Sequence, residues 1–273
     1  MDKFQLALIT GASGGIGESL ARLLASKKIN LIICGRHQER LELLKNELSQ
    51  LVQVQVFSMD LEKKEARKEL TKIIEERVPD LVVNNAGFGL YGDATVIDLE
   101  QQMNILELNI SALTELSIVS GRALIKAGKK GVIHNVSSAG AFITFPSFAL
   151  YSSSKAYVNH FSRSFDFEMK PYGIRVLASC PGIVLTKFRF RATLGQPFEK
   201  RSESKETLGV MSPEFAANEI WWQIVHEKPI HIFSWKYRWA IRLSRFLPDC
   251  WITPGIRKKV HTYCPPGHLL DKQ

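Results

Sequence analysis

The sequence predicts an α/β fold in which a doubly wound parallel sheet of about seven strands, in the order 3-2-1-4-5-6-7, is covered by helices on both faces. Three observations lead to this prediction. Short apolar runs alternate with longer segments of helical period along residues 4–179. A glycine cluster over residues 11–17 lies between the first apolar run and the first helical segment. The alternation contains no internal repeat, so it implies right-handed crossovers and a sheet that is buried on both sides.

The individual elements follow from the same periodicity. Strands are expected where apolar runs are short, over residues 4–10, 30–34, 52–57, 80–83, 131–136 and 174–179, with a seventh over 230–233. Helices are expected over residues 15–28, 36–50, 61–78, 99–126, 150–170, 213–227 and 235–247. Pro79 ends the third helix, and Ser212 followed by Pro213 is typical of a helix start. Residues 181–210 show no clear period.

Composition bounds the class of protein. The chain has 273 residues, 45% of them hydrophobic, and a net charge of +9. Such a charge suits nucleic acid, an anionic membrane or phosphorylated ligands, or is an ordinary lysine-rich surface. The four cysteines form no CxxC pair or zinc spacing, so we expect no metal site and a reducing, cytoplasmic compartment. No signal peptide precedes the first strand and no apolar run reaches about 18 residues, so no transmembrane helix is expected.

The glycine cluster predicts a nucleotide site. Its sequence is Thr10-Gly11-Ala12-Ser13-Gly14-Gly15-Ile16-Gly17. Glycines at this position let the backbone approach a pyrophosphate, whose charge the helix N-terminus favours, although a glycine cluster can also be only a tight turn. After the second strand the chain has Arg36 and no carboxylate until Glu39. Arg36 therefore indicates NADP(H), with NAD(H) as the alternative cofactor and a plain surface arginine as the alternative role.

A second pattern predicts proton transfer. Tyr151 and Lys155 are four residues apart and share one face of the predicted helix. A nearby ammonium favours phenolate, so we expect Lys155 to lower the pKa of Tyr151. Hydride transfer to a carbonyl leaves negative charge on its oxygen, where a hydroxyl donor and a proton donor must meet. Ser138, after the fifth strand, would polarise the carbonyl and Tyr151 would protonate it; Ser137 is the competitor for the serine role.

Taken together, these motifs resemble the short-chain dehydrogenases/reductases over residues 4–186. The motifs are Thr10-Gly11-x-x-x-Gly15-x-Gly17, Asn84-Asn85-Ala86-Gly87, Asn109, Ser138, Tyr151-x-x-x-Lys155 and Pro181-Gly182-x-x-x-Thr186. Residues 84–89 are also similar to a bacterial subgroup of poorly assigned oxidoreductases. The resemblance implies a Rossmann-type catalytic domain over residues 1–234 with a lid over about 182–210. Residues 235–273 would be a C-terminal amphipathic helix and tail and not an independent domain.

The resemblance also implies a role for each matching residue. The cofactor phosphates would be lined by Thr10, Gly11, Ser13, Gly15, Ile16 and Gly17. Asp60 would bond the adenine, Asn84 and Ala86, followed by Gly87, would flank the adenosine ribose, and the loop of Pro181, Gly182, Ile183 and Thr186 would bind the nicotinamide carboxamide. Ser138, Tyr151, Lys155 and Asn109 would form the catalytic set, in which Lys155 holds the nicotinamide ribose and Asn109 holds a water that links Lys155 to solvent. The helices of Asn109 and Tyr151 would pair in a homodimer or homotetramer.

The last third is expected to choose the substrate. Residues 187–191 alternate basic and aromatic side chains, which resembles a nucleic-acid strip, but a lid over an apolar substrate is favoured and no nucleic acid is expected. Over 235–247, Trp235, Trp239 and Leu243 share one side of an amphipathic helix that ends near Leu247. Such a helix either contacts a membrane peripherally or packs on its own domain or a second subunit.

The function predicted from these features is that of an NADPH-dependent carbonyl reductase, or its reverse as an alcohol dehydrogenase. Its substrate would be a partly hydrophobic ketone, aldehyde or acyl-type compound. The alternative is an NADP-binding regulatory or membrane-docking protein without significant turnover.

Overall fold

The computed structural model describes residues 4–193, 210–244, 246–248, 250–251 and 253–256. Its centre is a parallel sheet in the order β3-β2-β1-β4-β5-β6-β9. The strands are β1 (Leu6–Thr10), β2 (Asn30–Gly35), β3 (Val54–Ser58), β4 (Leu81–Asn84), β5 (Gly131–Val136), β6 (Ile174–Cys180) and β9 (Ile230–Ile232). The predicted fold class and strand order are confirmed, with β9 as the seventh strand.

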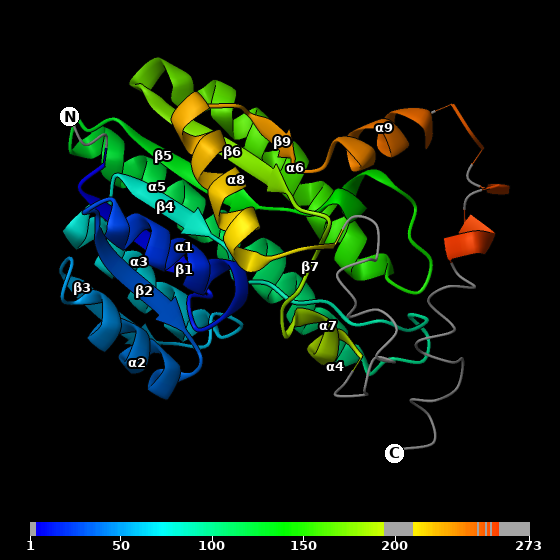
Figure 1. The fold of residues 1–273 in the computed structure, drawn as a ribbon, viewed down its shortest axis with the longest axis horizontal. Coiled ribbons are helices and arrows are strands. Elements are labelled where there is room, and N and C mark those ends of the chain that lie inside the picture. Colours follow the sequence, from blue (N-terminus) through cyan, green and yellow to red (C-terminus); the bar gives the residue numbers. More distant parts are fainter. Residues whose placement is uncertain (1–3, 194–209, 245, 249, 252, 257–273) are drawn as a thin grey trace.

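Helices cover both faces of this sheet (Figure 1). One layer contains α1 (Gly15–Ser26), α2 (Gln38–Leu48) and α8 (Pro213–His226), and the other contains α3 (Lys64–Arg77), α5 (Leu113–Lys126) and α6 (Ala149–Met169). Alternation along β1 explains the two layers. Ala7 and Ile9 belong to the core with α1 and α8, whereas Leu8 belongs to the core with α3 and α5. Side chains of opposite faces alternate along a strand, so each strand contributes to both cores.

The long helix predicted over residues 99–126 contains an irregularity. It consists of α4 (Leu99–Leu106), a π-helical segment over Glu107–Ala112 and α5. Asn109 lies within the π-helical segment and its side chain is fully buried. A π-helical turn changes the direction of its side chains relative to an α-helix and is frequent at functional sites. Sequence periodicity alone does not distinguish such a turn from the α-helix around it.

The region after β6 has more regular structure than its sequence predicts. A short helix α7 (Phe188–Ala192) is present, and β7 (Ile183–Val184) pairs with β8 (Val210–Met211) in a small parallel sheet. These elements are too short to give a periodic signal. The lid expected over about 182–210 is described only in part, because residues 194–209 lie outside the described residues.

The helix start predicted at Ser212 and Pro213 is confirmed. At the start of α8, the Ser212 hydroxyl accepts a hydrogen bond from the Phe215 N–H at 3.1 Å, with proline next in the chain. Helix α9 (Trp235–Ser244) ends three residues before the predicted boundary. Residue 245 and the tail over 257–273 lie outside the described residues. Among the described helices, none combines the length and the apolar content that crossing a bilayer requires.

Candidate active site

A single cavity of about 1750 Å³ opens at the carboxyl ends of the sheet strands. In open α/β sheets this edge is where ligands bind. Most of the site residues expected from the sequence line this cavity: Gly11, Ser13, Gly15, Ile16, Arg36, Asp60, Ala86, Gly87, Ser138, Tyr151, Lys155, Pro181, Gly182, Ile183 and Thr186. Segments far apart in sequence therefore meet around one space, large enough for a dinucleotide and a second ligand.

Thr10 and Gly17 do not line the cavity, contrary to their expected contact with phosphates. The Thr10 hydroxyl accepts hydrogen bonds from the N–H groups of Asn85 and Ala86, both at 3.0 Å, and so ties β1 to the loop after β4. At Gly17, an added Cβ would lie 2.5 Å from the carbonyl oxygen of Gly11. Both residues support the glycine loop from the side of the protein interior.

Asn84 is also not where the family resemblance predicted. Its side chain is buried inside the sheet layer and donates to Asn135 at 2.8 Å and Ser117 at 3.0 Å. The structure does not bring it to the ribose side of the cavity. Its amide nitrogen joins β4 to β5 and α5, because an unpaired donor in this position would be costly.

Asn109 lies behind the cavity wall as well. Its amide donates to the Phe88 carbonyl at 2.9 Å and to Ser154 at 3.0 Å, and its oxygen accepts from the Phe88 N–H at 3.1 Å. An added Cβ on Gly87 would lie 3.0 Å from the Asn109 oxygen and 3.1 Å from the Lys155 ammonium. Both polar groups thus border Gly87, whose lack of a side chain leaves room between them.

Ser138 and Tyr151 both line the cavity, and the Ser138 hydroxyl is close enough to Tyr151 to favour the phenolate form. Ser138 caps the short turn after β5, where its oxygen accepts from the Gly140 N–H at 3.1 Å. The competitor Ser137 also lines the cavity, but it is buried and its hydroxyl already donates to the Lys155 carbonyl at 2.9 Å. The geometry therefore favours Ser138 as the partner of Tyr151.

Burial, more than charge, determines the proton affinities of the pair. Burial raises the pKa of Tyr151 above its ordinary value, and the hydrogen bond with Ser138 only partly opposes this. Burial also lowers the pKa of Lys155 to about 8. The Lys155 ammonium donates to the Val136 carbonyl at 2.9 Å and lies 5.8 Å from the Tyr151 ring centre. The expected lowering of the Tyr151 pKa by Lys155 is therefore absent, because desolvation of the phenol dominates.

Aromatic rings form the wall beside Tyr151. Phe148 stacks on Tyr151 with ring centres 4.3 Å apart and on Tyr91 at 4.1 Å. Phe145 meets Phe148 at 5.5 Å, and Phe188 of α7 lies 5.4 Å from Tyr151. All five rings line the cavity. They make the space around the reacting hydroxyl apolar, which suits a hydrophobic ligand.

The glycine loop fits a dinucleotide. Gly11 and Gly15 have φ values of +67° and +59°, a conformation that favours glycine. Added Cβ atoms there would lie 2.9 Å from Ala86 and from Thr186 respectively, across the space that the loop encloses. Helix α1 begins at Gly15, so the free N–H groups of its first turn can bind a pyrophosphate. The residues present are those that an NAD(P) cofactor needs.

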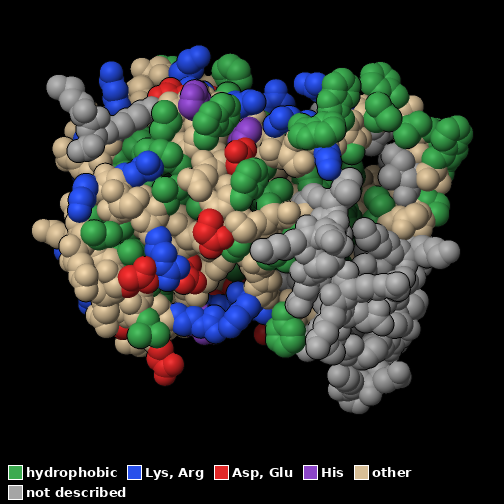
Figure 2. Space-filling view, viewed as in Figure 1, with side chains coloured by type: hydrophobic (Ala, Val, Ile, Leu, Met, Phe, Trp, Pro, Cys, Tyr) green, Lys and Arg blue, Asp and Glu red, His purple; other side chains and the backbone are tan. Residues whose placement is uncertain are grey.

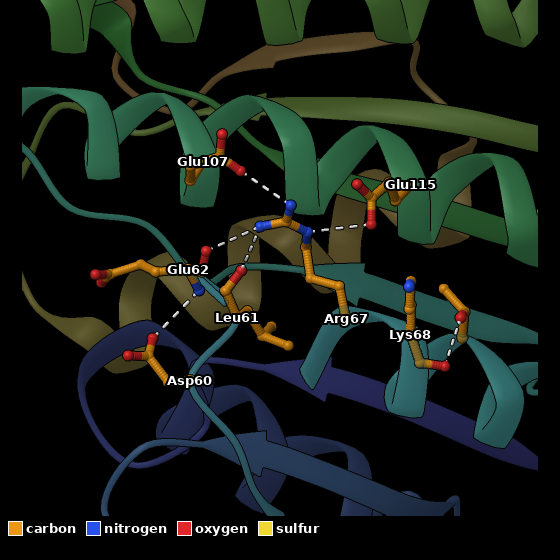
Figure 3. Close-up of polar contacts among 8 residues, drawn as sticks. Asp60, Leu61, Glu62, Arg67, Lys68, Glu107 and Glu115 are labelled. Atoms are coloured by element: carbon orange, nitrogen blue, oxygen red, sulfur yellow. Dashed lines mark hydrogen bonds and ion pairs between the residues drawn. The ribbon is translucent and has the colours of Figure 1, made fainter. Parts of the chain in front are cut away.

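At the other end of the cavity, Arg36 forms an ion pair with Glu62 at 2.8 Å. The loop that carries Asp60 and Glu62 is held by Arg67, a buried residue of α3 (Figure 3). Arg67 donates to the carbonyls of Leu61 at 3.2 Å and Glu62 at 3.0 Å. It also pairs with two carboxylates of the neighbouring helix, Glu107 at 2.9 Å and Glu115 at 3.1 Å. This network fixes the adenosine side of the site against the helix that contains Asn109.

Sequence reasoning missed several wall residues. They are Arg40, close to Arg36, and the rings of Tyr91, Phe145 and Phe148; Lys187 and Arg191 also line the cavity, but were expected only as part of a lid over the substrate. Arg40 is one helical turn after Arg36, a spacing that the sequence shows. Nothing in the sequence connects Tyr91 or Arg191 to distant strands.

The C-terminal helix closes one side of the cavity. Tyr237, Ala240 and Ile241 of α9 line it, and Ile241 is buried. An added Cβ on Gly182 would lie 2.2 Å from the Tyr237 ring, so this loop and α9 are in close contact. The inner face of α9 is thus part of the binding site and packs on its own chain.

Comparisons with known proteins agree with this site. The family model for short chain dehydrogenase matches residues 5–195. Sulfoacetaldehyde reductase 2 of Chromohalobacter salexigens is 30% identical over 77% of this chain and 85% of that protein.

Solved structures show the same fold. A bulky-bulky ketone specific alcohol dehydrogenase from Comamonas testosteroni has a TM-score of 0.75 at 23% identity, over 88% of this chain and 92% of that chain. A short-chain dehydrogenase from Sphingobium yanoikuyae in complex with NADPH has a TM-score of 0.74 at 25% identity, over 88% of this chain and 93% of that chain. With its motifs gathered around one cavity and the family model matched over most of its length, the chain belongs to the short-chain dehydrogenase/reductase family of NAD(P)-dependent oxidoreductases.

Proposed function

We propose that the protein is an NADPH-dependent carbonyl reductase, reversible as an alcohol dehydrogenase, for a partly hydrophobic ketone, aldehyde or acyl-type substrate. One observation carries the proposal: Ser138, Tyr151 and Lys155 line one cavity beside a wall of aromatic rings. Two similar proteins support it, one named a sulfoacetaldehyde reductase and the other solved with NADPH.

Ser138, Tyr151 and Lys155 would have different roles in the reduction of the carbonyl. The bound nicotinamide would supply the hydride. Ser138 and Tyr151 meet at one point, where a carbonyl oxygen can accept a hydrogen bond from both. Because burial keeps the Tyr151 phenol protonated, it holds the proton that the developing oxyanion takes. Lys155, buried and next to the same point, supplies positive charge and the route by which Tyr151 regains a proton; we expect Asn109 to hold a water on that route.

Cofactor choice is the finer part of the proposal. The strand β2 ends at Gly35 and is followed by Arg36 and not by a carboxylate, which supports NADP(H) over NAD(H). Arg40 and Arg191 line the same part of the cavity and add to its positive charge. Glu62 competes for Arg36 at 2.8 Å, so a bound 2′-phosphate would share or displace this ion pair.

The turnover of a Tyr151→Phe variant tests the proposed reaction. NADPH oxidation is measured with a panel of aliphatic and aromatic ketones and aldehydes. Tyr151→Phe should lower kcat by at least about 100-fold, the contribution typical of a general acid, while calorimetry shows NADPH still bound. Tyr157→Phe is the matched control, because Tyr157 lies on the same helix and bonds Thr114 at the surface. Wild type that reduces nothing, or Tyr151→Phe with wild-type turnover, would refute the proposed reaction.

The outer face of α9 supports a second proposal, peripheral binding to an anionic membrane. Trp235, Trp239 and Leu243 are each about 60% exposed, and Figure 2 shows hydrophobic side chains gathered at the upper right, over α9 as it lies in Figure 1. Lys236 lies over the Trp235 ring at 5.8 Å and Arg242 over the Trp239 ring at 5.7 Å. Exposed tryptophans beside cations are typical of interfacial helices. Because the opposite face of α9 lines the cavity, a hydrophobic substrate would enter from the lipid side.

Vesicle sedimentation tests this binding. We expect the protein to sediment with vesicles that contain phosphatidylglycerol and to stay in solution with pure phosphatidylcholine. Trp235→Ser combined with Trp239→Ser should abolish sedimentation. Leu51→Ser is the control, since Leu51 is 44% exposed just after α2, a helix that lies far from α9 in Figure 1. Equal binding by the double variant and wild type would exclude α9 as the contact. Membrane binding by a wild type that also shows no turnover would instead favour the regulatory, docking role.

Two further parts of the proposal concern assembly and compartment. Exposed apolar residues on the Asn109 and Tyr151 helices, Leu99 at 71% and Phe167 at 75%, support a homodimer or homotetramer through these helices. Light scattering should give at least the dimer mass for wild type and a lower mass for Phe167→Glu. The free, buried thiols of Cys34 and Cys180 and the exposed Cys250 support a reducing compartment, the cytoplasm.

A further inference from the structure

Four cations from two separate parts of the chain surround the adenosine end of the cavity. We call them the cationic rim, and they are Arg36, Arg40, Lys187 and Arg191. The first two lie at the junction of β2 and α2, whereas Lys187 precedes α7 and Arg191 lies within it. Figure 2 shows Lys and Arg side chains gathered at the lower edge, between β2 and α7 as these lie in Figure 1.

The rim has more positive than negative charge. Glu62 pairs with Arg36 at 2.8 Å, while Glu18 and Glu47, at the same end of the cavity, both pair with Arg22 at 2.7 Å. Within the described part of the chain, the other three rim cations form no ion pair. Like charges held this close repel one another unless an anion lies between them.

The charges are close enough to affect one another. The pKa of Arg191 is lowered by partial burial and then by Arg36 and Arg40. The pKa of His37, next to Arg36, is lowered by burial and then by all four rim cations. Arg191 thus lines the same cavity as Arg36 and Arg40 and lies within reach of their charge, although it belongs to a segment expected to contact substrate.

The short helix α7 also contacts the wall around the expected reacting group, Tyr151. Phe188 of α7 lies 5.4 Å from Tyr151. Three residues later, Arg191 faces the rim, and the Ala192 carbonyl then accepts a hydrogen bond from the Tyr91 N–H at 2.8 Å. Ala192 is fully buried. The two ends of α7 thus connect the wall of the reacting centre with the adenosine pocket.

We propose that Arg191 is a third guanidinium for the 2′-phosphate of NADP, and that this phosphate fixes α7, and with it Phe188, in place beside Tyr151. The inference rests on the proposed use of NADP and extends it from cofactor choice to the substrate wall. A guanidinium binds phosphate through strong, charge-assisted hydrogen bonds. A phosphate shared between α2 and α7 relieves the repulsion and links the two segments. NAD, which lacks this phosphate, would leave α7 unlinked.

Calorimetric titration tests the contact without any turnover. Arg191→Gln should weaken NADPH binding about tenfold or more and NADH binding less than twofold. Adenosine 2′,5′-bisphosphate and AMP should show the same contrast, which isolates the phosphate from the nicotinamide. Arg191→Lys should recover part of the loss, and Arg163→Gln, an exposed change on α6, should have no effect. Equal weakening of NADPH and NADH would overturn the inference, as would no weakening.

Trypsin tests the link to α7, because the Lys187–Phe188 bond is at its start. At saturating cofactor, NADPH should slow cleavage of this bond in wild type more than NADH does. In Arg191→Gln, protection by saturating NADPH should fall to the level given by NADH. Equal protection by both cofactors in wild type would overturn the link. Neither measurement needs a carbonyl substrate, so a protein that reduces nothing could still pass both, and the proposed reaction would then fail alone.

Discussion

Replacing Lys155 by methionine should show by how much the buried ammonium of this residue lowers the free energy of unfolding. The lysine is 4% exposed, and burial lowers its pKa from the ordinary value of 10.5 to about 8. Its ammonium donates to the Val136 carbonyl at 2.9 Å. Methionine is of similar length and carries no charge, so Lys155→Met removes the desolvation penalty together with this hydrogen bond.

The pH dependence separates the two effects. A folded-state pKa below the unfolded value means that the unfolded chain binds more protons between pH 8 and 10.5, so stability rises with pH across that window. The cost of the buried charge is therefore complete below about pH 8 and absent above about pH 10.5. At 1.36 kcal/mol for each pKa unit, it amounts to about 3 kcal/mol. Loss of the hydrogen bond is independent of pH and only displaces the whole curve.

Urea unfolding, followed by tryptophan fluorescence at several values between pH 7 and 10.5, is the assay. The free energy of unfolding of Lys155→Met minus that of wild type should fall by about 3 kcal/mol across this range. Lys68→Met is the control, because Lys68 is exposed on α3, as Figure 3 shows beside Arg67. A difference between Lys155→Met and wild type that stays constant with pH would refute the reasoning, since it would mean that Lys155 is not desolvated.

Three other outcomes are expected. The kcat/KM for NADPH in carbonyl reduction should fall as pH rises through about 8, where Lys155 of the free enzyme loses its charge; a flat profile to pH 9.5 would contradict this. Burial lowers the pKa of His134 to about 4, so about 3 kcal/mol of stability should be lost as pH falls from 6.5 to 4, and His134→Gln should lose less in acid unfolding. Arg67→Met should lower the free energy of unfolding by about 2–4 kcal/mol, because the carbonyls of Leu61 and Glu62 lose their donor, and should weaken NADPH binding in calorimetry. Lys68→Met again serves as control, and an unchanged NADPH affinity would show that Arg67 does not hold the adenosine loop.

Much of the fold could be predicted because its strands are buried on both faces. Continuous apolar runs such as those of β1 and β2 mark central parallel strands, and the alternation with helices leaves few arrangements. What could not be predicted is local. The sequence of the π-helical segment that contains Asn109 is equally compatible with an α-helix, and α7 is only five residues long. Helix boundaries, as at Ser244, depend on tertiary contacts as well as on propensity.

The site divides in the same way. Ser138, Tyr151 and Lys155 could be placed because each occupies a fixed position relative to a strand end or a helix turn. Thr10 and Asn84 were assigned to the cofactor, yet the structure turns both side chains into the protein, where buried polar groups bond one another. The pKa of Tyr151 was also misjudged, because spacing reports the neighbouring charge and not the burial that outweighs it.

The two faces of α9 relate the proposed substrate cavity to the proposed membrane contact. Its inner face contacts the Pro181–Gly182 loop so closely that Gly182 has no room for a side chain beneath Tyr237. Any inward movement of α9 must therefore displace that loop, which borders the expected nicotinamide site, or turn the Tyr237 ring. Its outer face exposes Trp235 and Trp239. If the proposed lipid contact forms on the outer face, it would bear on the width of the cavity through Tyr237, because both faces belong to the same ten-residue helix.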